Sequence, residues 1–134
     1  MFLCHQDALS IPAHTNLLSP NRESLLDSAG LVRAVGFDAS GTLLATLGRD
    51  GSLRIWNAHT GVEVAALSGD SHPITVFASA PSEGMLAVGY RDGQLRLLDR
   101  ANWQPRFSIA VSTNALCCLA YHPGGHKLAV AAAD

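Results

Sequence analysis

The sequence predicts an all-β fold of short antiparallel strands, because one hairpin motif occurs twice at a fixed spacing. Residues 43–57 are expected to form a strand, a two-residue turn at Asp50-Gly51 and a second strand. Asp-Gly between β-rich runs is a strong hairpin signal, because the tight primed turn needs positive φ and glycine adopts it without a Cβ clash. Residues 86–99 repeat the pattern around Asp92-Gly93, so the turns at positions 50 and 92 lie 42 residues apart.

Further residues align at the same period, and such internal repeats indicate the architecture. The aligned columns are Leu44-Ala45 with Leu86-Ala87 and Leu128-Ala129, Ala39 with Pro81 and Pro123, Leu25 with Leu67 and Ile109, and Leu53 with Leu95. Four short strands in a repeat of about 42 residues are typical of one blade of a β-propeller. Because a blade packs both faces against its neighbours, the nearly all-apolar run at 43–47 fits a strand inside such a blade.

The N-terminal residues show the weakest pattern. Residues 1–20 have no sustained periodicity and contain Pro12 and Pro20, so we expect an irregular lead-in. Residues 22–26 fit either a helical turn after Pro20 or a strand, and the register of Leu25 with Leu67 and Ile109 favours the strand.

From residue 31 onward, apolar or alternating runs are separated by turn residues, as expected for strands. The expected strands are 31–37, 43–47, 53–57, 62–67, 74–77, the two arms of the hairpin at 86–99, 106–109 and 116–121. We therefore expect repeats over 21–134, with blade one at about 31–67, blade two at about 73–109 and a truncated third blade at 114–134.

These motifs resemble the WD40 repeat family over roughly residues 22–134. The resemblance rests on the residues 37–45 and 50–57, on Thr60-Gly61, on Pro81, Gly84 and the residues 86–99, and on the residues 121–125 with Leu128-Ala129. Leu98-Asp99 stands where the family often has Trp-Asp. The resemblance implies an all-β, WD40-like β-propeller fragment of antiparallel four-stranded blades.

The family often links each blade by a hydrogen-bonded group of a loop His, the Asp of the Asp-Gly turn, a strand hydroxyl and a Trp. Repeat one keeps Asp50 and Trp56, but Gly30 occupies the position that matches His72 of repeat two. Repeat two has His72 and Asp92, but Leu98 replaces the Trp. We therefore expect ordinary packing to hold the blades, with Asp50, Gly51, Asp92, Gly93 and Trp56 in structural roles.

Two full repeats and part of a third cannot close a ring, whereas family propellers usually have about seven blades. The terminal blades of an open array would expose apolar faces, and such exposure is unfavourable for the solubility of a single chain. We expect a fragment or truncated form of a longer propeller, completed by further blades of that chain; self-association into a ring is the alternative.

Composition limits the classes of binding partner and the cellular location that we expect for this protein. A net charge of −2 gives no reason to expect nucleic acid or an anionic membrane as a partner. No apolar run is long enough to span a bilayer, and residues 1–4 lack the basic start of a secretory signal. Three cysteines do not make a disulfide framework, so we expect a cytoplasmic or nuclear protein.

Catalytic, metal and cofactor sites are not expected. His122 and His126 flank a glycine turn, and adjacent Cys117 and Cys118 would face opposite sides of a buried strand, so neither pair chelates a metal. No nucleophile elbow or phosphate-binding loop occurs, and Gly48–Gly51 lies between strands rather than before a helix. Asp50 and Asp92 fit turn residues, with nothing beside them that would shift a pKa.

Arg49 and Arg91 each precede an Asp-Gly turn, on the rim that family members often use for partners. With His72 they are the candidate binding residues, since two arginines could form a basic spot for carboxylates or phosphopeptides. The competing interpretation is plain solvated charge. A ubiquitin-ligase adaptor signature, Trp-Asp-x-Arg in the family, is absent from residues 56–59.

The function expected from the resemblance is a non-enzymatic protein-interaction scaffold that displays binding loops on rigid blades. The alternative is the non-catalytic propeller part of a larger multidomain enzyme.

Overall fold

A computed structural model of the chain describes residues 31–68, 72–82 and 84–133. The chain divides into two compact units, Met1–Ser68 and Gly69–Asp134, and each is described by itself. The expected lead-in at 1–20, the expected strand at 22–26 and Gly30 lie outside the described residues.

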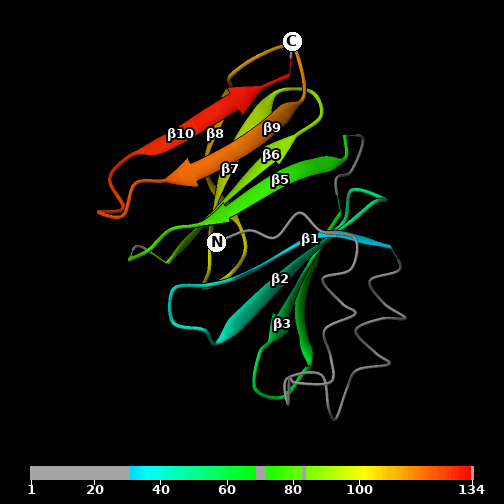
Figure 1. Cartoon of the computed structure of the whole chain (residues 1–134), viewed down its shortest axis with the longest axis vertical. Helices are drawn as coiled ribbons and strands as arrows, with labels where there is room; N and C mark the ends of the chain where they lie inside the picture. The colour runs from blue at the N-terminus through cyan, green and yellow to red at the C-terminus, as the bar shows by residue number, and fades with distance from the viewer. Residues whose placement is uncertain (1–30, 69–71, 83, 134) are drawn as a thin grey trace. The chain divides into compact units, whose positions relative to one another are not determined.

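The first unit contains one antiparallel sheet of four strands in the order β1-β2-β3-β4. The strands are β1 (Val32–Phe37), β2 (Leu43–Gly48), β3 (Leu53–Asn57) and β4 (Glu63–Leu67). Each strand pairs with the next one along the chain, which Figure 1 shows as a meander from cyan to green. The predicted hairpin at 43–57 is confirmed as β2 and β3.

The interior strand β2 is buried on both of its faces. Leu44 and Thr46 point to one face and Ala45 and Leu47 to the other, since side chains alternate along a strand, and all four are at most 7% exposed. The apolar character of residues 43–47 thus reflects burial on two sides, as the sequence predicts for a strand inside a blade.

The second unit contains a four-stranded antiparallel sheet and a separate two-stranded hairpin. The sheet has the order β5-β6-β7-β8, with β5 (Ile74–Ser79), β6 (Met85–Tyr90), β7 (Gln94–Asp99) and β8 (Pro105–Ala110). The hairpin consists of β9 (Leu116–Tyr121) and β10 (Leu128–Ala132), and β9 packs against β5 and β6 of the sheet (Figure 1). All described strands are antiparallel and none of the described residues is helical, which confirms the all-β fold class.

The hairpin packs on the sheet through a small apolar core. Leu116 and Leu119 of β9 are buried together with Ala78, Ala87 and Leu95 of the sheet. Partly buried residues surround this core: Val76, Leu97, Tyr121, Leu128, Val130 and Ala132.

A glycine and a hydroxyl bring β9 close to the sheet. A Cβ at Gly89 would lie 2.7 Å from Val76 Cγ1 and 3.0 Å from Leu116 Cβ, so no larger residue fits without a shift. The Thr75 hydroxyl donates a hydrogen bond of 2.5 Å to the Leu116 carbonyl. Small side chains on the sheet therefore fix how closely the hairpin approaches.

The Asp-Gly turns differ from the expected two-residue primed turn. Gly51 has a φ of +83° and its N–H donates to the Gly48 carbonyl, but no aspartate of the described chain has positive φ. Gly48 N–H in turn donates to the Ser52 carbonyl, which leaves three residues in the loop. This is a three-residue hairpin loop, in which only the glycine is left-handed.

Among the described residues, no helix is long and apolar enough to cross a membrane.

Candidate interaction surface at the Asp-Gly turns

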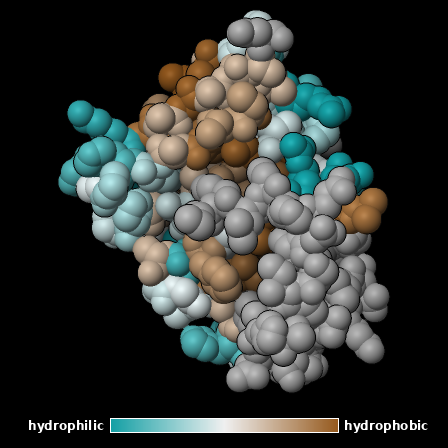
Figure 2. Space-filling model, in the orientation of Figure 1, coloured by the Kyte–Doolittle hydropathy of each residue, from teal (hydrophilic) through white to brown (hydrophobic). Residues whose placement is uncertain are grey.

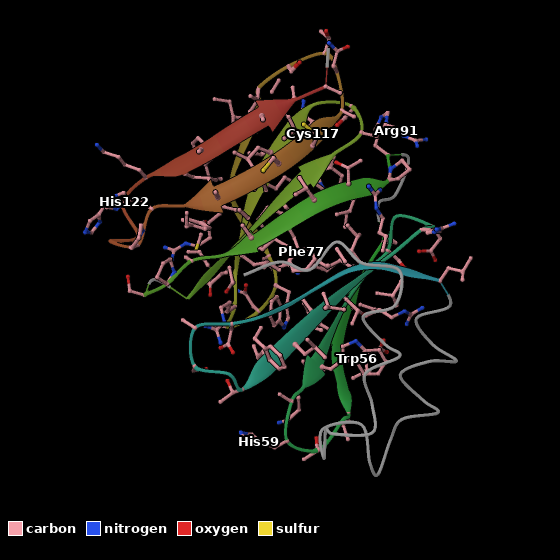
Figure 3. All side chains as sticks on the ribbon, viewed as in Figure 1. Trp56, His59, Phe77, Arg91, Cys117 and His122 are labelled. Atoms are coloured by element: carbon pink, nitrogen blue, oxygen red, sulfur yellow. The ribbon has the colours of Figure 1, made fainter. Side chains whose placement is uncertain are left out.

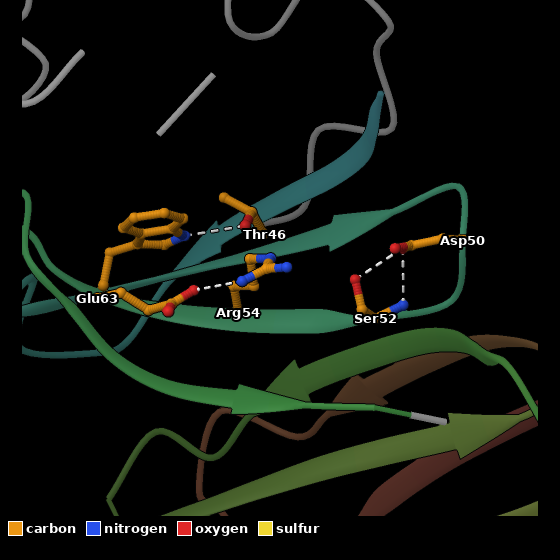
Figure 4. Close-up of polar contacts among 6 residues, drawn as sticks. Thr46, Asp50, Ser52, Arg54 and Glu63 are labelled. Carbon is orange, nitrogen blue, oxygen red and sulfur yellow. Dashed lines mark hydrogen bonds and ion pairs between the residues drawn. The ribbon is translucent and has the colours of Figure 1, made fainter. Parts of the chain in front are cut away.

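The first Asp-Gly turn is held by the carboxylate of Asp50. Its Oδ1 accepts hydrogen bonds from Ser52 N–H at 3.0 Å and from the Ser52 hydroxyl at 2.7 Å (Figure 4). The Ser52 hydroxyl, followed by the Ser52 N–H, lowers the pKa of Asp50 below its ordinary value of 3.8. The expectation that nothing beside this residue shifts its pKa was wrong, because the hydroxyl two positions later turns back onto the carboxylate.

The direction of this shift bears on the chemistry that Asp50 can perform. A carboxyl with a lowered pKa is ionised throughout the neutral range, so it cannot hold a proton to donate there. The geometry of Asp50 therefore fits the predicted turn role.

The second turn brings a predicted binding residue beside its aspartate. Asp92 Oδ1 accepts a hydrogen bond from Gln94 N–H at 3.0 Å, which repeats the backbone contact of Asp50. The other oxygen, Oδ2, lies 3.7 Å from His72 Nε2, and the imidazole is 55% exposed. When His72 is protonated, this contact is an ion pair at the protein surface.

Arg49 and Arg91 occupy the same local position in their respective units. Arg49 N–H donates to the Leu31 carbonyl at 2.8 Å, and Arg91 N–H donates to the Pro73 carbonyl at 2.9 Å. Both side chains are exposed, and neither forms an ion pair with a carboxylate among the described residues; Figure 3 labels Arg91 at its hairpin tip. Each unit therefore carries an exposed guanidinium directly before its Asp-Gly turn.

Trp56 has a structural role in the first unit. It is 2% exposed, and its indole N–H donates to the Thr46 hydroxyl at 2.9 Å (Figure 4). In the second unit Leu98 and Val88 stand at the two equivalent positions, 3% and 0% exposed, and are held by apolar packing alone. Neither unit therefore has all four residues of the family's hydrogen-bonded group. The first unit has the tryptophan and the hydroxyl, Trp56 and Thr46, and the second unit has the histidine and the aspartate, His72 and Asp92.

The third strand of each four-stranded sheet carries one arginine whose contact was not predicted from the sequence. Arg54 Nη1 lies 2.7 Å from Glu63 Oε1, across from β3 to β4. Arg96, which lies 42 residues later, stacks on the Tyr90 ring with its guanidinium carbon 4.7 Å from the ring centre. The signal was present in the sequence, because each arginine directly follows an aligned leucine, Leu53 or Leu95.

The cysteines of β9 differ from the prediction. Cys117 and Cys118 were expected on a buried strand, but both are exposed. The register places Ala131 opposite Cys118 and Ala132 opposite Leu116, so a bulge at Cys117 interrupts the regular alternation of faces. Figure 3 shows Cys117 on β9 and His122 at the turn to β10, where His122 Nδ1 accepts Gly124 N–H at 3.0 Å.

Within residues 31–68, 72–82 and 84–133, no three His, Cys, Asp or Glu side chains are grouped so that they could hold a metal ion.

Comparison with known families identifies the repeat. The family described as "WD domain, G-beta repeat" (WD40) matches residues 22–57, which include β1, β2 and β3 of the first unit. Residues 22–57 thus match a WD40 repeat. The predicted resemblance is thereby confirmed, and the four-stranded sheets are WD40 blades.

Three curated proteins show the extent of the similarity to longer chains. Periodic tryptophan protein 2 homolog of Dictyostelium discoideum is 28% identical over 107 residues, which cover 77% of this chain and 12% of that protein. Telomerase protein component 1 of Mus musculus is 28% identical over 111 residues, 79% of this chain and 4% of that protein. WD repeat-containing protein SL1-17 of Schistosoma mansoni is 29% identical over 98 residues, 73% of this chain and 33% of that protein. This WD40 chain thus spans one third or less of the length of each of these relatives.

Proposed function

We propose that this chain is a non-enzymatic scaffold that binds other proteins through the arginine that precedes the Asp-Gly turn in each unit. One observation carries the proposal: each four-stranded sheet presents an exposed arginine, Arg49 or Arg91, directly before a rigid turn. The turn is rigid because a carboxylate closes it and a left-handed glycine shapes it. An exposed guanidinium can bind a carboxylate or phosphate with two parallel hydrogen bonds.

The proposed partners are proteins with acidic or phosphorylated segments. The neighbourhood of His72 and Asp92 adds a second polar contact at the same turn as Arg91. Nucleic acid is left out of the proposal because the net charge of the chain is −2. A cytoplasmic or nuclear location is part of the proposal.

Charge reversal at both turns tests this function. The variant Arg49→Glu/Arg91→Glu should lose the proteins that the unaltered chain retains in a pulldown. Arg33→Glu is a matched control, because Arg33 is exposed on β1 and carries the same charge away from the turns. If the double variant retains the same proteins as the control, the two arginines are merely solvated charge and the proposed function fails.

We further propose that the chain is part of a longer propeller, since the aligned residues cover only 12%, 4% and 33% of the three relatives. The second candidate, the propeller part of a multidomain enzyme, is supported only by the same difference in length. Transcript sequence on both sides of the reading frame distinguishes them: further repeats near a 42-residue spacing support the longer propeller, and a catalytic domain supports the enzyme.

A further inference from the structure

The turn between β7 and β8 has the same backbone geometry as the turn between β3 and β4. Trp103 N–H donates to the Asp99 carbonyl at 2.6 Å, and Gly61 N–H, 42 positions earlier, donates to the Asn57 carbonyl at 2.8 Å. Both Trp103 and Gly61 have left-handed backbone, with φ of +58° and +71°. The two units therefore form one kind of turn, although glycine closes it in the first unit and tryptophan closes it in the second.

Three positions in and beside this turn carry larger side chains in the second unit than in the first. At the 42-residue period, Ala58, Gly61 and Val64 correspond to Arg100, Trp103 and Arg106. Tryptophan and arginine are, with tyrosine, the residues that most often contribute binding energy at protein interfaces. The second unit therefore gathers the residue types of a binding hot spot at one turn, whereas the first unit forms the same turn without them.

Trp103 is an unfavourable residue for this backbone. Left-handed φ brings a Cβ close to the backbone, so bulky residues adopt it rarely. Among the described residues, Trp103 is the only non-glycine residue with a positive φ. Local strain of this kind is found most often at functional sites. The turn itself does not require the indole, because the first unit forms it with Gly61, so a role in binding accounts for Trp103 better than a role in the turn.

Trp103 and Arg106 are accessible to solvent and are tied to the same aspartate. The Arg106 side chain is 68% exposed, and Trp103 is partly exposed. Asp99 accepts the Trp103 N–H with its carbonyl, and its Oδ2 lies 3.5 Å from Arg106 Nη1. The Asp99 Oδ1 accepts the Ala101 N–H at 2.8 Å, which fixes the carboxylate to the turn. One hydrogen-bonded turn therefore presents both the indole and the guanidinium.

The charge of this turn favours an acidic partner. Figure 2 shows hydrophilic surface at the β9–β10 turn and apolar surface over β9 and β10 themselves, whereas the β7–β8 turn combines an aromatic ring with guanidinium groups. Residues 99–106 contain two arginines and one aspartate, so this segment has a net charge of +1 in a chain of net charge −2. Such a charge complements a carboxylate but is too small to neutralise the several phosphates of a nucleic acid strand.

We propose that Trp103 and Arg106 form a docking site for a protein segment that carries an aromatic side chain beside a carboxylate. The aromatic side chain packs on the indole, and the carboxylate binds the Arg106 guanidinium. The present contact of Arg106 with Asp99, at 3.5 Å, is longer than the ~2.7–2.9 Å of a close charged hydrogen bond, so a partner carboxylate can replace it. The site lies at the opposite end of β7 from Arg91 and is separate from the surface of the proposed function.

The test uses the full chain labelled with 5-fluorotryptophan, and the probe is the end-blocked peptide Gly-Glu-Phe-Glu-Gly. The chain contains two tryptophans, so its fluorine NMR spectrum has one signal from Trp103 and one from Trp56, which is 2% exposed and serves as the internal control. The Trp103 signal should shift on titration while the Trp56 signal stays in place. Replacement of Phe by Ala, or of both Glu by Lys, should weaken binding of the probe about threefold or more. Equal affinity for the three peptides would overturn the proposal.

Variants of the chain identify the side chains that bind the probe, which then carries 4-fluorophenylalanine as its label. Trp103→Gly removes the indole and suits the left-handed backbone, and Arg106→Glu reverses the charge; each should weaken binding about threefold or more. Arg33→Glu is the matched control, because Arg33 is exposed on β1 of the first unit. Unchanged binding by folded Trp103→Gly or Arg106→Glu would overturn the proposal, as would tighter binding of a short oligothymidylate than of the peptide. None of these variants alters Arg49 or Arg91, so failure here leaves the proposed function untouched.

Discussion

Single residues account for how the same repeat is built twice with different chemistry. Thr46 and Trp56 form a buried hydrogen bond in the first unit, whereas Val88 and Leu98 fill the equivalent positions with apolar side chains. A buried N–H without a partner costs about 1–3 kcal/mol, so the two positions are expected to change together. The Thr46 hydroxyl and the Trp56 indole therefore depend on each other.

Trp103 shows a further difference between repeats at the scale of one residue. It has a φ of +58°, and the residue 42 positions earlier, Gly61, has a φ of +71°. Left-handed backbone costs a non-glycine residue roughly 1–2 kcal/mol. The second unit therefore keeps the left-handed backbone of this turn at Trp103, although glycine, the residue that adopts it most easily, is absent there.

Replacement of Trp103 separates this backbone strain from the packing of the indole. Both Trp103→Gly and Trp103→Ala lose the indole, but only glycine relieves the left-handed strain. The glycine variant should be the more stable by about 1 kcal/mol in chemical denaturation. Equal stability of the two variants would show that the backbone at this position is unstrained.

The pKa of Asp50 provides a prediction of pH dependence. Because its pKa is lowered in the folded chain, its contribution to stability is present above the unfolded pKa of about 3.9 and is lost as pH falls through the folded pKa. Ser52→Ala removes the larger of the two hydrogen-bond contributions. An NMR titration should then find the pKa of the Asp50 carboxyl raised toward its ordinary value of 3.8. No change at Asp50 would assign the shift to another cause.

At the scale of elements, the close approach of β9 to the β5–β8 sheet depends on Gly89. A methyl group there would lie 2.7 Å from Val76 Cγ1, which is closer than packed carbon atoms tolerate. The hairpin is therefore sensitive to side-chain volume on the sheet beneath it.

Gly89→Ala should destabilise the chain by about 1–3 kcal/mol, because overpacking forces the hairpin or Val76 to move. The double variant Gly89→Ala/Val76→Ala should recover part of this loss, since it removes the atom nearest to the new methyl group. Chemical denaturation measures both. Equal destabilisation of the single and double variants would place the strain elsewhere.

The sequence predicted these elements well because strands and turns leave local signals. The spacing of Asp50 and Asp92 and the apolar run at 43–47 were sufficient to place β2, β3, β6 and β7. The turn type was missed because Asp-Gly fits both two-residue and three-residue loops, and the bond from the Gly48 N–H to the Ser52 carbonyl distinguishes the two only in the structure. The exposure of Cys117 and Cys118 was missed because a bulge has no simple residue signature.

For the molecule as a whole, the repeat predicts the number and order of strands, but the candidate site depends on contacts between distant residues. The proximity of His72 and Asp92 spans 20 positions of sequence and follows only from the placement of β5 beside β6. The exposure of Phe107 and Ile109 on β8 likewise follows from where the hairpin lies on the sheet. Sequence patterns do not determine either arrangement.

The central claim is that the two four-stranded sheets are WD40 blades of one design. Residue-resolved amide hydrogen exchange tests this claim most directly. The amides of Leu44 and Thr46 in β2 and those of Leu86 and Val88 in β6 should all exchange slowly, because both strands lie between two neighbours of their sheet. Fast exchange at Leu86 and Val88 with slow exchange at Leu44 and Thr46 would show that the two sheets differ in design, and would contradict the account.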